Sequence, residues 1–375
     1  MNVGMKRLFF CMLFRVLLVL PLGAQTIKPF VMPSARAAGF GGIHAAQGDD
    51  FSSIFSNPAS FAGLEKEWSA AEITISLYGP MFQILDNIVN SSGDISSIAN
   101  TDRFAAGFDI GGPLAIGIVN KGFAFGIFNR TTADTDIRFD LLGRQLLPTV
   151  SEEVFLTGGY SFHVLERDNH TVDIGFLGKG FYRARISMQA PASDLGSMFD
   201  TTSSAPFETH FGLGIDIGLS YTYAGIVTVA LAGYDVFSPA LVTEYADSSD
   251  WGTGGSQSYA RVQPRLALGA LWRIRNDFLD RYISGLTFMA DYRDFINLFE
   301  KDRRHPLLNV SLGMEVTLLK ILRFRAGMAD ALPAAGFGIN MTVLTLDVAF
   351  HGKELGNKPG DKRTFAFDLG ILFRY

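Results

Sequence analysis

The sequence predicts an all-β protein, a 14-stranded antiparallel transmembrane β-barrel with an N-terminal luminal hatch of short helices and coil. The chain of 375 residues is 48% hydrophobic and only 18% charged, yet no apolar run of about 18 residues follows its N-terminal leader, which argues against membrane helices. Apolar side chains instead alternate with small or polar ones at period two. Long and short connections between these segments also alternate, as they do in membrane barrels.

Composition excludes several other classes of protein. The apolar content excludes disorder, and a net charge of −5 without a basic block argues against a nucleic-acid partner. The six histidines are dispersed, and neither H-E-x-x-H nor G-x-S-x-G occurs. The only cysteine, Cys11, falls in the leader. We therefore expect no enzyme, no catalytic residues, no cofactor and no metal site.

Residues 1–24 read as a signal peptide. Lys6 and Arg7 precede an apolar run that ends in small residues up to Ala24, which is the order of parts in a secretory signal. A single membrane anchor is the alternative, but the run is short and Arg15 interrupts it. Export together with a barrel predicts the bacterial outer membrane.

Residues 25–71 do not alternate and are rich in glycine, alanine and serine. This segment is too long and too apolar for a simple linker. A barrel of fourteen strands has a lumen too wide for its own wall side chains to fill. We therefore expect residues 25–71 to fold into the lumen as a hatch, and residues 72–375 to form the barrel.

Period-two alternation is clearest from Phe211 to Tyr223, where every odd-numbered residue is apolar or aromatic. The chain also closes on an amphipathic segment ending in Tyr375. Such an ending resembles the signal read by the barrel-assembly machinery during insertion; the alternative is an ordinary edge strand. The predicted strands are 72–78, 104–119, 122–138, 153–166, 170–189, 208–224, 226–238, 259–275, 284–296, 307–317, 321–329, 335–341, 343–351 and 364–375.

Charged residues fall on the face opposite the bulky apolar one, and we assign that face to the lumen because an Arg or Lys near the membrane midplane costs about 2–4 kcal/mol. Arginines near the external ends of these faces are candidate contacts for a ligand carboxylate. Pairing with luminal aspartates is the alternative. The candidates are Arg183, Arg185, Arg265 and Arg293.

Two further features bear on a ligand. The inward face of 104–119 is nearly all small, which either leaves space for a plug or an apolar ligand or relieves crowding where strands coil. Apolar residues in two long external loops are candidates for capturing a ligand, although such loops also pack on themselves. These capture candidates are Leu195, Met198, Phe199, Leu241, Val242 and Trp251.

The segment from Ser34 to Gly39, the pairs Gly41-Gly42 and Asp49-Asp50, and above all Asn57-Pro58-Ala59 resemble the hatch of FadL-type outer-membrane transporters of long-chain fatty acids. Related spirochaete outer-membrane proteins of unassigned function look similar. The resemblance implies a hatch motif at Asn57, Pro58 and Ala59. It also implies external capture, an internal pocket with a basic contact, and exit through a gap at a kinked third strand. Within 122–138, Gly126 is the candidate for that lateral gate.

These expectations favour a plugged outer-membrane transporter for diffusive uptake of long-chain fatty acids or other hydrophobic small molecules. Its partners are then the hydrophobic ligand, outer-membrane lipid and the barrel-assembly machinery. Two alternatives stay open. One is a general, water-filled porin, and the other is a non-transporting scaffold that carries other surface proteins, because a fold alone does not fix a function.

Overall fold

The computed structural model describes residues 25–48, 51–64, 66–80, 105–140, 143–191, 205–247, 250–274, 283–301 and 303–374. The expected signal peptide, residues 1–24, lies outside this part of the chain, as does the terminal Tyr375. Within it, no helix is both long and apolar enough to cross a membrane.

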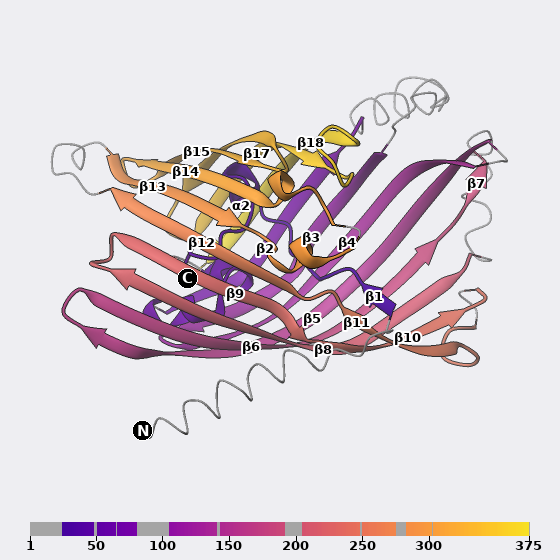
Figure 1. Ribbon diagram of the computed structural model, residues 1–375, viewed down its shortest axis with the longest axis horizontal. Coiled ribbons are helices and arrows are strands. Elements are labelled where there is room, and N and C mark those ends of the chain that lie inside the picture. The colour runs from indigo at the N-terminus through magenta and orange to yellow at the C-terminus, as the bar shows by residue number, and fades with distance from the viewer. Residues whose placement is uncertain are drawn as a thin grey trace.

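The strands form one closed antiparallel barrel, because the last strand pairs with the first barrel strand (Figure 1). Its wall has fourteen strands, as the sequence predicted. The labels number sixteen because β9 and β10 are consecutive parts of one wall strand, and β11 and β12 are consecutive parts of another. The wall strands are β2 (Glu67–Tyr78), β3 (Ala105–Asn120), β4 (Phe123–Asp140), β5 (Gly143–Arg167), β6 (His170–Ser187), β8 (Phe207–Tyr223), β9 (Val227–Phe237), β10 (Pro239–Tyr245), β11 (Ser256–Val262), β12 (Arg265–Ile274), β13 (Ile283–Tyr292), β14 (Val310–Leu318), β15 (Leu322–Ala329), β16 (Leu332–Asn340), β17 (Leu344–Glu354) and β18 (Arg363–Arg374).

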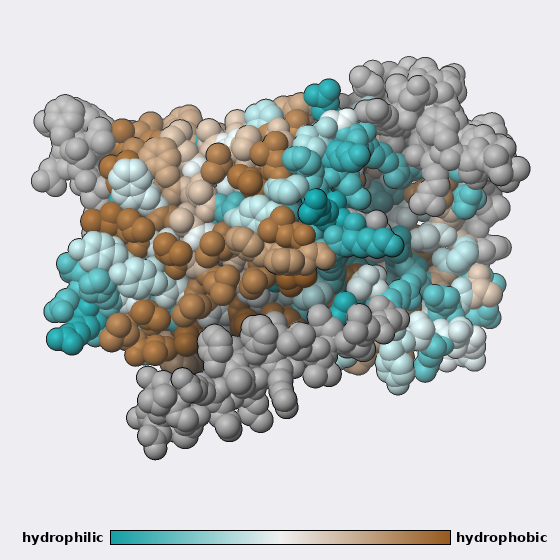
Figure 2. Space-filling model, viewed as in Figure 1, coloured by the Kyte–Doolittle hydropathy of each residue, from teal (hydrophilic) through white to brown (hydrophobic). Residues whose placement is uncertain are grey.

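The outer face of the barrel is apolar. On β8, Phe211 and Leu213 are about 60% exposed, whereas the intervening Gly212 is buried. Figure 2 shows the resulting hydrophobic belt, with a hydrophilic region towards one end of the molecule. A closed barrel satisfies its backbone hydrogen bonds internally and therefore tolerates lipid. The protein is a β-barrel of the bacterial outer membrane, as the sequence predicted.

The barrel strands extend further than the alternation indicated. The first begins at Glu67 rather than at residue 72. The expected external loop 139–152 is largely strand. β5 starts at Gly143, and its residues from Gly143 to Tyr160 pair with β4. The expected loop 239–258 is likewise mostly the hairpin of β10 and β11. Cross-strand hydrogen bonds hold these extensions even though Pro148 and neighbouring leucines break the period-two pattern.

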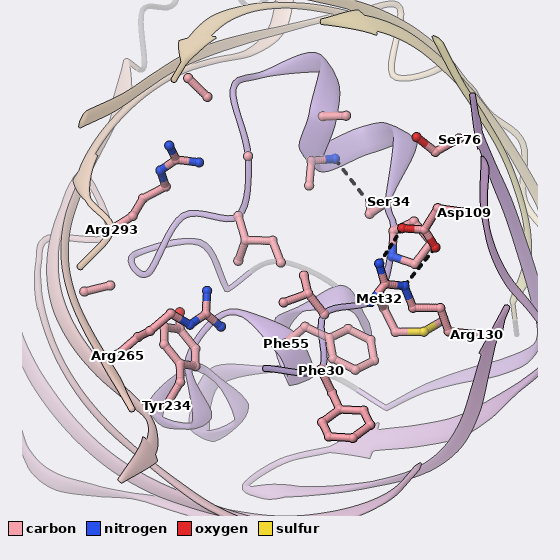
Figure 3. Close-up of a pocket in the computed structure, with 18 of the residues that line it drawn as sticks. Phe30, Met32, Ser34, Phe55, Ser76, Asp109, Arg130, Tyr234, Arg265 and Arg293 are labelled. Atoms are coloured by element: carbon pink, nitrogen blue, oxygen red, sulfur yellow. Dashed lines mark hydrogen bonds and ion pairs between the residues drawn. The ribbon is translucent and has the colours of Figure 1, made fainter. Parts of the chain in front are cut away.

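Residues 28–48 and 51–64, here called the luminal segment, lie inside the ring of strands (Figure 3). They contain α2 (Ala35–Gly39) and the 3₁₀ helices η1 (Phe51–Phe55) and η2 (Pro58–Gly63). The remaining short elements are β1 (Gln25–Ile27), which pairs in parallel with β11, β7 (Ala190–Pro191), and the 3₁₀ helices η6 (Ile296–Phe299) and η7 (Pro306–Asn309).

Two parts of the luminal segment pack directly on glycines of the wall. A side chain at Gly175 would lie 2.2 Å from the carbonyl carbon and oxygen of Pro58, and one at Gly218 would lie 1.9 Å from Oδ1 of Asn57. At the other end, a side chain at Gly327 would lie 2.3 Å from the carbonyl carbon of Phe40. Because these glycines have no Cβ, the luminal segment can approach the wall closely at both contacts, which we call glycine seats.

Charged contacts also tie the luminal segment to the wall. Arg36 on α2 pairs with Glu315 at 3.2 Å, and Arg325 bridges Glu315 to Asp347. His44 pairs through Nδ1 with Asp291, whose other carboxylate oxygen accepts the N–H of Ala45 at 2.7 Å. These groups are buried, so each pair replaces the water that both groups lose. Glu315 and Asp291, on the wall, thus anchor the luminal segment.

Apolar packing fills the end of the lumen that carries the short turns. The carbonyl oxygen of Phe61 on η2 accepts the N–H of Gly122, in the turn between β3 and β4, at 2.8 Å. Phe51, Ile54 and Phe128 are fully buried above it in one hydrophobic cluster. Short turns mark the periplasmic side of such barrels. This part of the luminal segment therefore packs at the periplasmic end of the lumen.

Candidate functional site

A cavity of about 400 Å³ lies between the luminal segment and the wall. This volume falls in the range of pockets that take small organic ligands. One side is the stretch from Phe30 to Ser34 together with Ile43, Ile54 and Phe55, and the rest comes from inward faces of the wall. In Figure 3, Arg265, Arg293 and Tyr234 lie along one wall and Ser76, Asp109 and Arg130 along the opposite one.

Phenylalanines supply much of the apolar surface of the cavity. Phe30 packs on Phe181 with ring centroids 4.3 Å apart, and Phe55 meets Phe155 edge to face at 6.0 Å. Phe155 stacks in turn on Phe128 in the core below. Tilted and edge-to-face rings pack favourably beyond their buried area. The floor of the cavity is therefore a continuous aromatic surface.

The cavity is also lined by basic side chains, and three of them, Arg130, Lys179 and Arg293, pair with carboxylates. Arg130 forms a bidentate pair with Asp109, at 2.6 and 2.8 Å. Lys179 lies 2.8 Å from Asp216 and 2.7 Å from Asp235. These charges are neutralised within the wall and hold neighbouring strands together. They leave little attraction for an incoming anion.

Arg265 is different. Its guanidinium lies over the ring of Tyr234, 5.1 Å from the centroid, and its buried Nε–H has no acceptor in the part of the chain that the structure describes. Asp294 acts on it electrostatically but forms no ion pair with it there. The Asp294 carboxylate instead accepts backbone N–H groups of Ile296 and Asn297. Arg265 thus lines the cavity with a guanidinium that forms no ion pair among the described residues.

Arg183 and Arg185, which the sequence also put forward, lie outside the cavity lining. Arg183 pairs with Glu153 at 2.7 Å, donates to the carbonyl oxygen of Lys28 at 3.2 Å and covers the ring of Phe30 at 4.0 Å. Arg185 pairs with Glu208 at 2.9 Å and is partly exposed. In this structure both have the role that the sequence left open as the alternative, which is pairing with wall carboxylates.

Arg293 lines the cavity but is held at its external end by a cluster of charges. It pairs with Asp330, in the turn between β15 and β16, and Arg304 pairs with the same carboxylate at 2.9 Å. Burial by itself raises the pKa of Asp330, but the two guanidinium groups outweigh it and hold that pKa below its ordinary value. Asp330 is therefore ionised and joins Arg293 and Arg304 to the β15–β16 turn.

Three of the six loop residues expected to capture a ligand are described by the structure, and these three do not come together. Leu195, Met198 and Phe199 lie outside the described residues. Leu241 and Val242 are in strand β10 rather than in a loop, and Val242 is fully buried in the luminal core. Trp251 is 63% exposed in the β10–β11 connection and meets Phe207 edge to face. The described members of the set therefore form no common apolar patch.

Asn57, Pro58 and Ala59 begin η2. The side chain of Asn57 caps this helix by accepting the N–H of Ala59 at 2.9 Å, and its amide donates to the carbonyl oxygen of Ala45 at 2.9 Å. A proline at the first position suits a helix start. The motif thus ties two parts of the luminal segment together on the Gly175 and Gly218 seat.

Gly126, the candidate for a lateral gate, lies in continuous ladders on both sides. It pairs with Gly117 on β3 and with Thr157 on β5. A side chain there would lie 2.5 Å from the ring of Phe128, so the glycine makes room for that ring. The wall is interrupted instead on β3, where the register shifts between Gly111 and Ala115.

Both interpretations of the small-residue wall on β3 hold in part. Side chains at Gly111 and Gly117 would lie 2.9 Å from Pro33 and 2.7 Å from Phe51, so these two glycines receive the luminal segment. One at Gly107 would meet the ring of Tyr78 at 2.7 Å, a contact within the wall itself. The glycines therefore accommodate the luminal segment and relieve crowding within the wall.

Sequence reasoning missed several residues of the site. Tyr234, Lys179 and Lys353 line the cavity, yet none has a signal that separates it from other inward-facing residues. Phe30 and Phe55 belong to the luminal segment, where no period assigns a face. Among the described residues, no group of three histidine, cysteine, aspartate or glutamate side chains is placed to bind a metal ion.

The chain matches no family model and no curated protein sequence. Solved structures do match it. A FadL homologue from Pseudomonas aeruginosa is 14% identical with a TM-score of 0.46, covering 93% of this chain and 99% of its own. The toluene transporter TodX of Pseudomonas putida is 10% identical with a TM-score of 0.44, covering 93% of this chain and 99% of its own.

The toluene transporter TbuX of Ralstonia pickettii is 13% identical with a TM-score of 0.49, covering 94% of this chain and 98% of its own. At such values, function has to be argued from the side chains of this protein. The FadL-type group is nevertheless the one that the luminal motif resembles. In its motif and among solved structures, the chain resembles the FadL-type outer-membrane proteins.

Proposed function

We propose that this protein carries hydrophobic molecules with an acidic group across the outer membrane by diffusion, with long-chain fatty acids as the model ligand, and that the luminal segment acts as a hatch. The observation that carries the proposal is the cavity itself. It combines an aromatic floor with Arg265, a guanidinium that forms no ion pair with a carboxylate of the described residues. A hydrocarbon chain fits the first feature, and a carboxylate fits the second.

The packing at the periplasmic end of the lumen argues against the porin alternative. An open, water-filled channel needs a continuous polar path. Here Phe51, Phe61 and Phe128 are fully buried at the periplasmic end of the lumen, and η2 is hydrogen-bonded to the β3–β4 turn. In planar bilayers we expect no steady conductance from the wild-type protein. Large, stable channels would favour the porin.

A binding titration tests the role of Arg265. Hexadecanoate and hexadecanol differ only in the head group, so a guanidinium contact should favour the acid. Charge-assisted hydrogen bonds are worth about 1.5–3 kcal/mol, which is roughly tenfold to a hundredfold in affinity. We expect the wild type to prefer hexadecanoate by this factor in displacement of a fluorescent probe.

Variants at Arg265 then separate charge from shape. Arg265→Gln is expected to lose the preference for the acid, and Arg265→Lys to retain part of it, because lysine keeps the charge but loses the planar pair of donors. Arg185→Gln serves as the matched control, since Arg185 lies outside the cavity lining and pairs with Glu208. An equal preference in all variants would contradict the proposed contact. Binding of neither compound would favour the scaffold.

A further inference from the structure

A second cation lines the cavity without a carboxylate partner. Lys353 on β17 lies over the ring of Tyr78, 4.8 Å from the centroid, and forms none of the ion pairs found in the described part of the chain. Asp134 acts on it electrostatically but is shared with Lys28, Arg130 and Arg185. Lys353 therefore resembles Arg265, since each has a tyrosine ring where the other cavity cations have a carboxylate.

The two cations stand on different sides of the lumen. Arg265 is on β12 and Lys353 on β17, five strands away in the order of the sheet. At about 4.8 Å per strand, roughly 24 Å of wall separates them. Lys353 also leans towards β2, the strand of Ser76, which lies on the wall opposite Arg265 in Figure 3. Each lies nine residues from the short-turn end of its strand, so the two are at a similar depth.

The cavity that contains both cations also has an apolar lining. Val31, Ile43 and Phe55 of the luminal segment line the same cavity that contains both cations. A ligand with one acidic head satisfies only one of these cations and leaves the other facing its hydrocarbon tail. An uncompensated charge beside hydrocarbon is costly, whereas a second acidic group at the far end of the ligand removes that cost.

We propose that the cavity selects amphiphiles with an acidic group at each end, such as long-chain α,ω-dicarboxylates, which bind Arg265 with one carboxylate and Lys353 with the other. This inference rests on the proposed function, because it requires an acidic amphiphile in the cavity. It adds the substrate class and assigns Lys353 as the contact that distinguishes diacids from monoacids.

Paired ligands test the inference. Hexadecanedioate and hexadecanoate have the same chain length and differ in one terminal carboxylate. In displacement titrations at neutral pH, where both acids are ionised, we expect the wild type to bind the diacid roughly tenfold more tightly. Lys353→Gln is expected to bring the ratio of the two affinities to about one, and Arg265→Gln to weaken both ligands.

Lys358→Gln is the matched control, because Lys358 is exposed in the β17–β18 connection and does not line the cavity. It should keep the wild-type ratio. Heat-dependent migration on SDS gels checks that each variant is a folded barrel. Equal affinity of the wild type for both acids, or a ratio unaffected by Lys353→Gln, would overturn the inference and leave the monoacid proposal standing. If neither acid binds, the proposed function itself fails.

Discussion

The glycine seat under the Asn57-Pro58-Ala59 motif gives a sharp test of how the luminal segment is held. In Gly175→Ala, the new Cβ would lie 2.2 Å from the carbonyl carbon and oxygen of Pro58. Both atoms belong to the backbone of a capped turn, so a side-chain rotation cannot relieve the overlap. Overpacking of this kind costs about 1–3 kcal/mol.

The clash raises the free energy of the seated state, whereas the hydrogen bonds of the Asn57 side chain with Ala59 and Ala45 lie within the luminal segment and add nothing to this difference. A cost of about 1–3 kcal/mol would raise the population of the unseated segment by roughly fivefold to a hundredfold. Because η2 packs at the periplasmic end of the lumen, unseating it opens a path for ions.

Single-channel recording in planar bilayers measures this population. We expect Gly175→Ala to show frequent openings that the wild type lacks. Gly178→Ala on the same strand is the control, since the nearest atom to a Cβ there is the carbonyl oxygen of Gly158 at 3.6 Å, an ordinary contact. If Gly175→Ala is as silent as Gly178→Ala while both form folded barrels, the seat does not hold the luminal segment in the way inferred.

Three other predictions concern stability. Arg183→Met should destabilise the barrel, by less than the roughly 3–5 kcal/mol of a fully unpaired buried charge, because Glu153 loses its 2.7 Å partner but keeps Arg130 at 3.5 Å. Denaturant midpoints should show this loss, with partial recovery in the double variant Arg183→Met, Glu153→Gln, and no recovery would argue against the pair. Because the pKa of Asp330 is held below its ordinary value, the stabilisation of the fold by the ionised Asp330 is complete above about pH 4 and is lost as the pH falls through the folded-state pKa. Asp330→Asn should therefore lower the melting temperature at pH 7 and make little difference at pH 2. An equal loss at both pH values would contradict this reasoning. Ile215→Arg, on the exposed apolar face of β8, should cost about 2–4 kcal/mol in lipid-based unfolding titrations, and a neutral effect would place that face away from lipid.

Period-two alternation predicted the barrel because every strand must present one face to lipid and the other to the lumen. It separates Phe211 and Leu213 from Gly212 without any knowledge of the partner strand. It fails where strands extend beyond the membrane, because the outer face there no longer has to be apolar. This explains why 139–152 and 239–258 read as loops while the structure pairs them as strands.

The site was less predictable from sequence, because its groups come from strands distant in the chain. Arg183 and Arg265 look alike as inward arginines near external strand ends. Only the fold shows that the guanidinium of Arg183 pairs with Glu153 and covers the ring of Phe30, whereas that of Arg265 lies over Tyr234 beside a cavity. The seat at Gly175 and Gly218 is equally invisible in sequence, since it depends on where Asn57 and Pro58 touch the wall.

The central claim is that the lumen holds an acidic amphiphile against Arg265. The most direct measurement is to purify the wild type and Arg265→Gln from the same membranes, extract both with organic solvent, and identify the retained molecules by mass spectrometry. We predict an acidic, hydrophobic compound that is enriched in the wild type and much reduced in the variant. Recovery of the same neutral lipids from both proteins, or of nothing from either, would contradict the claim.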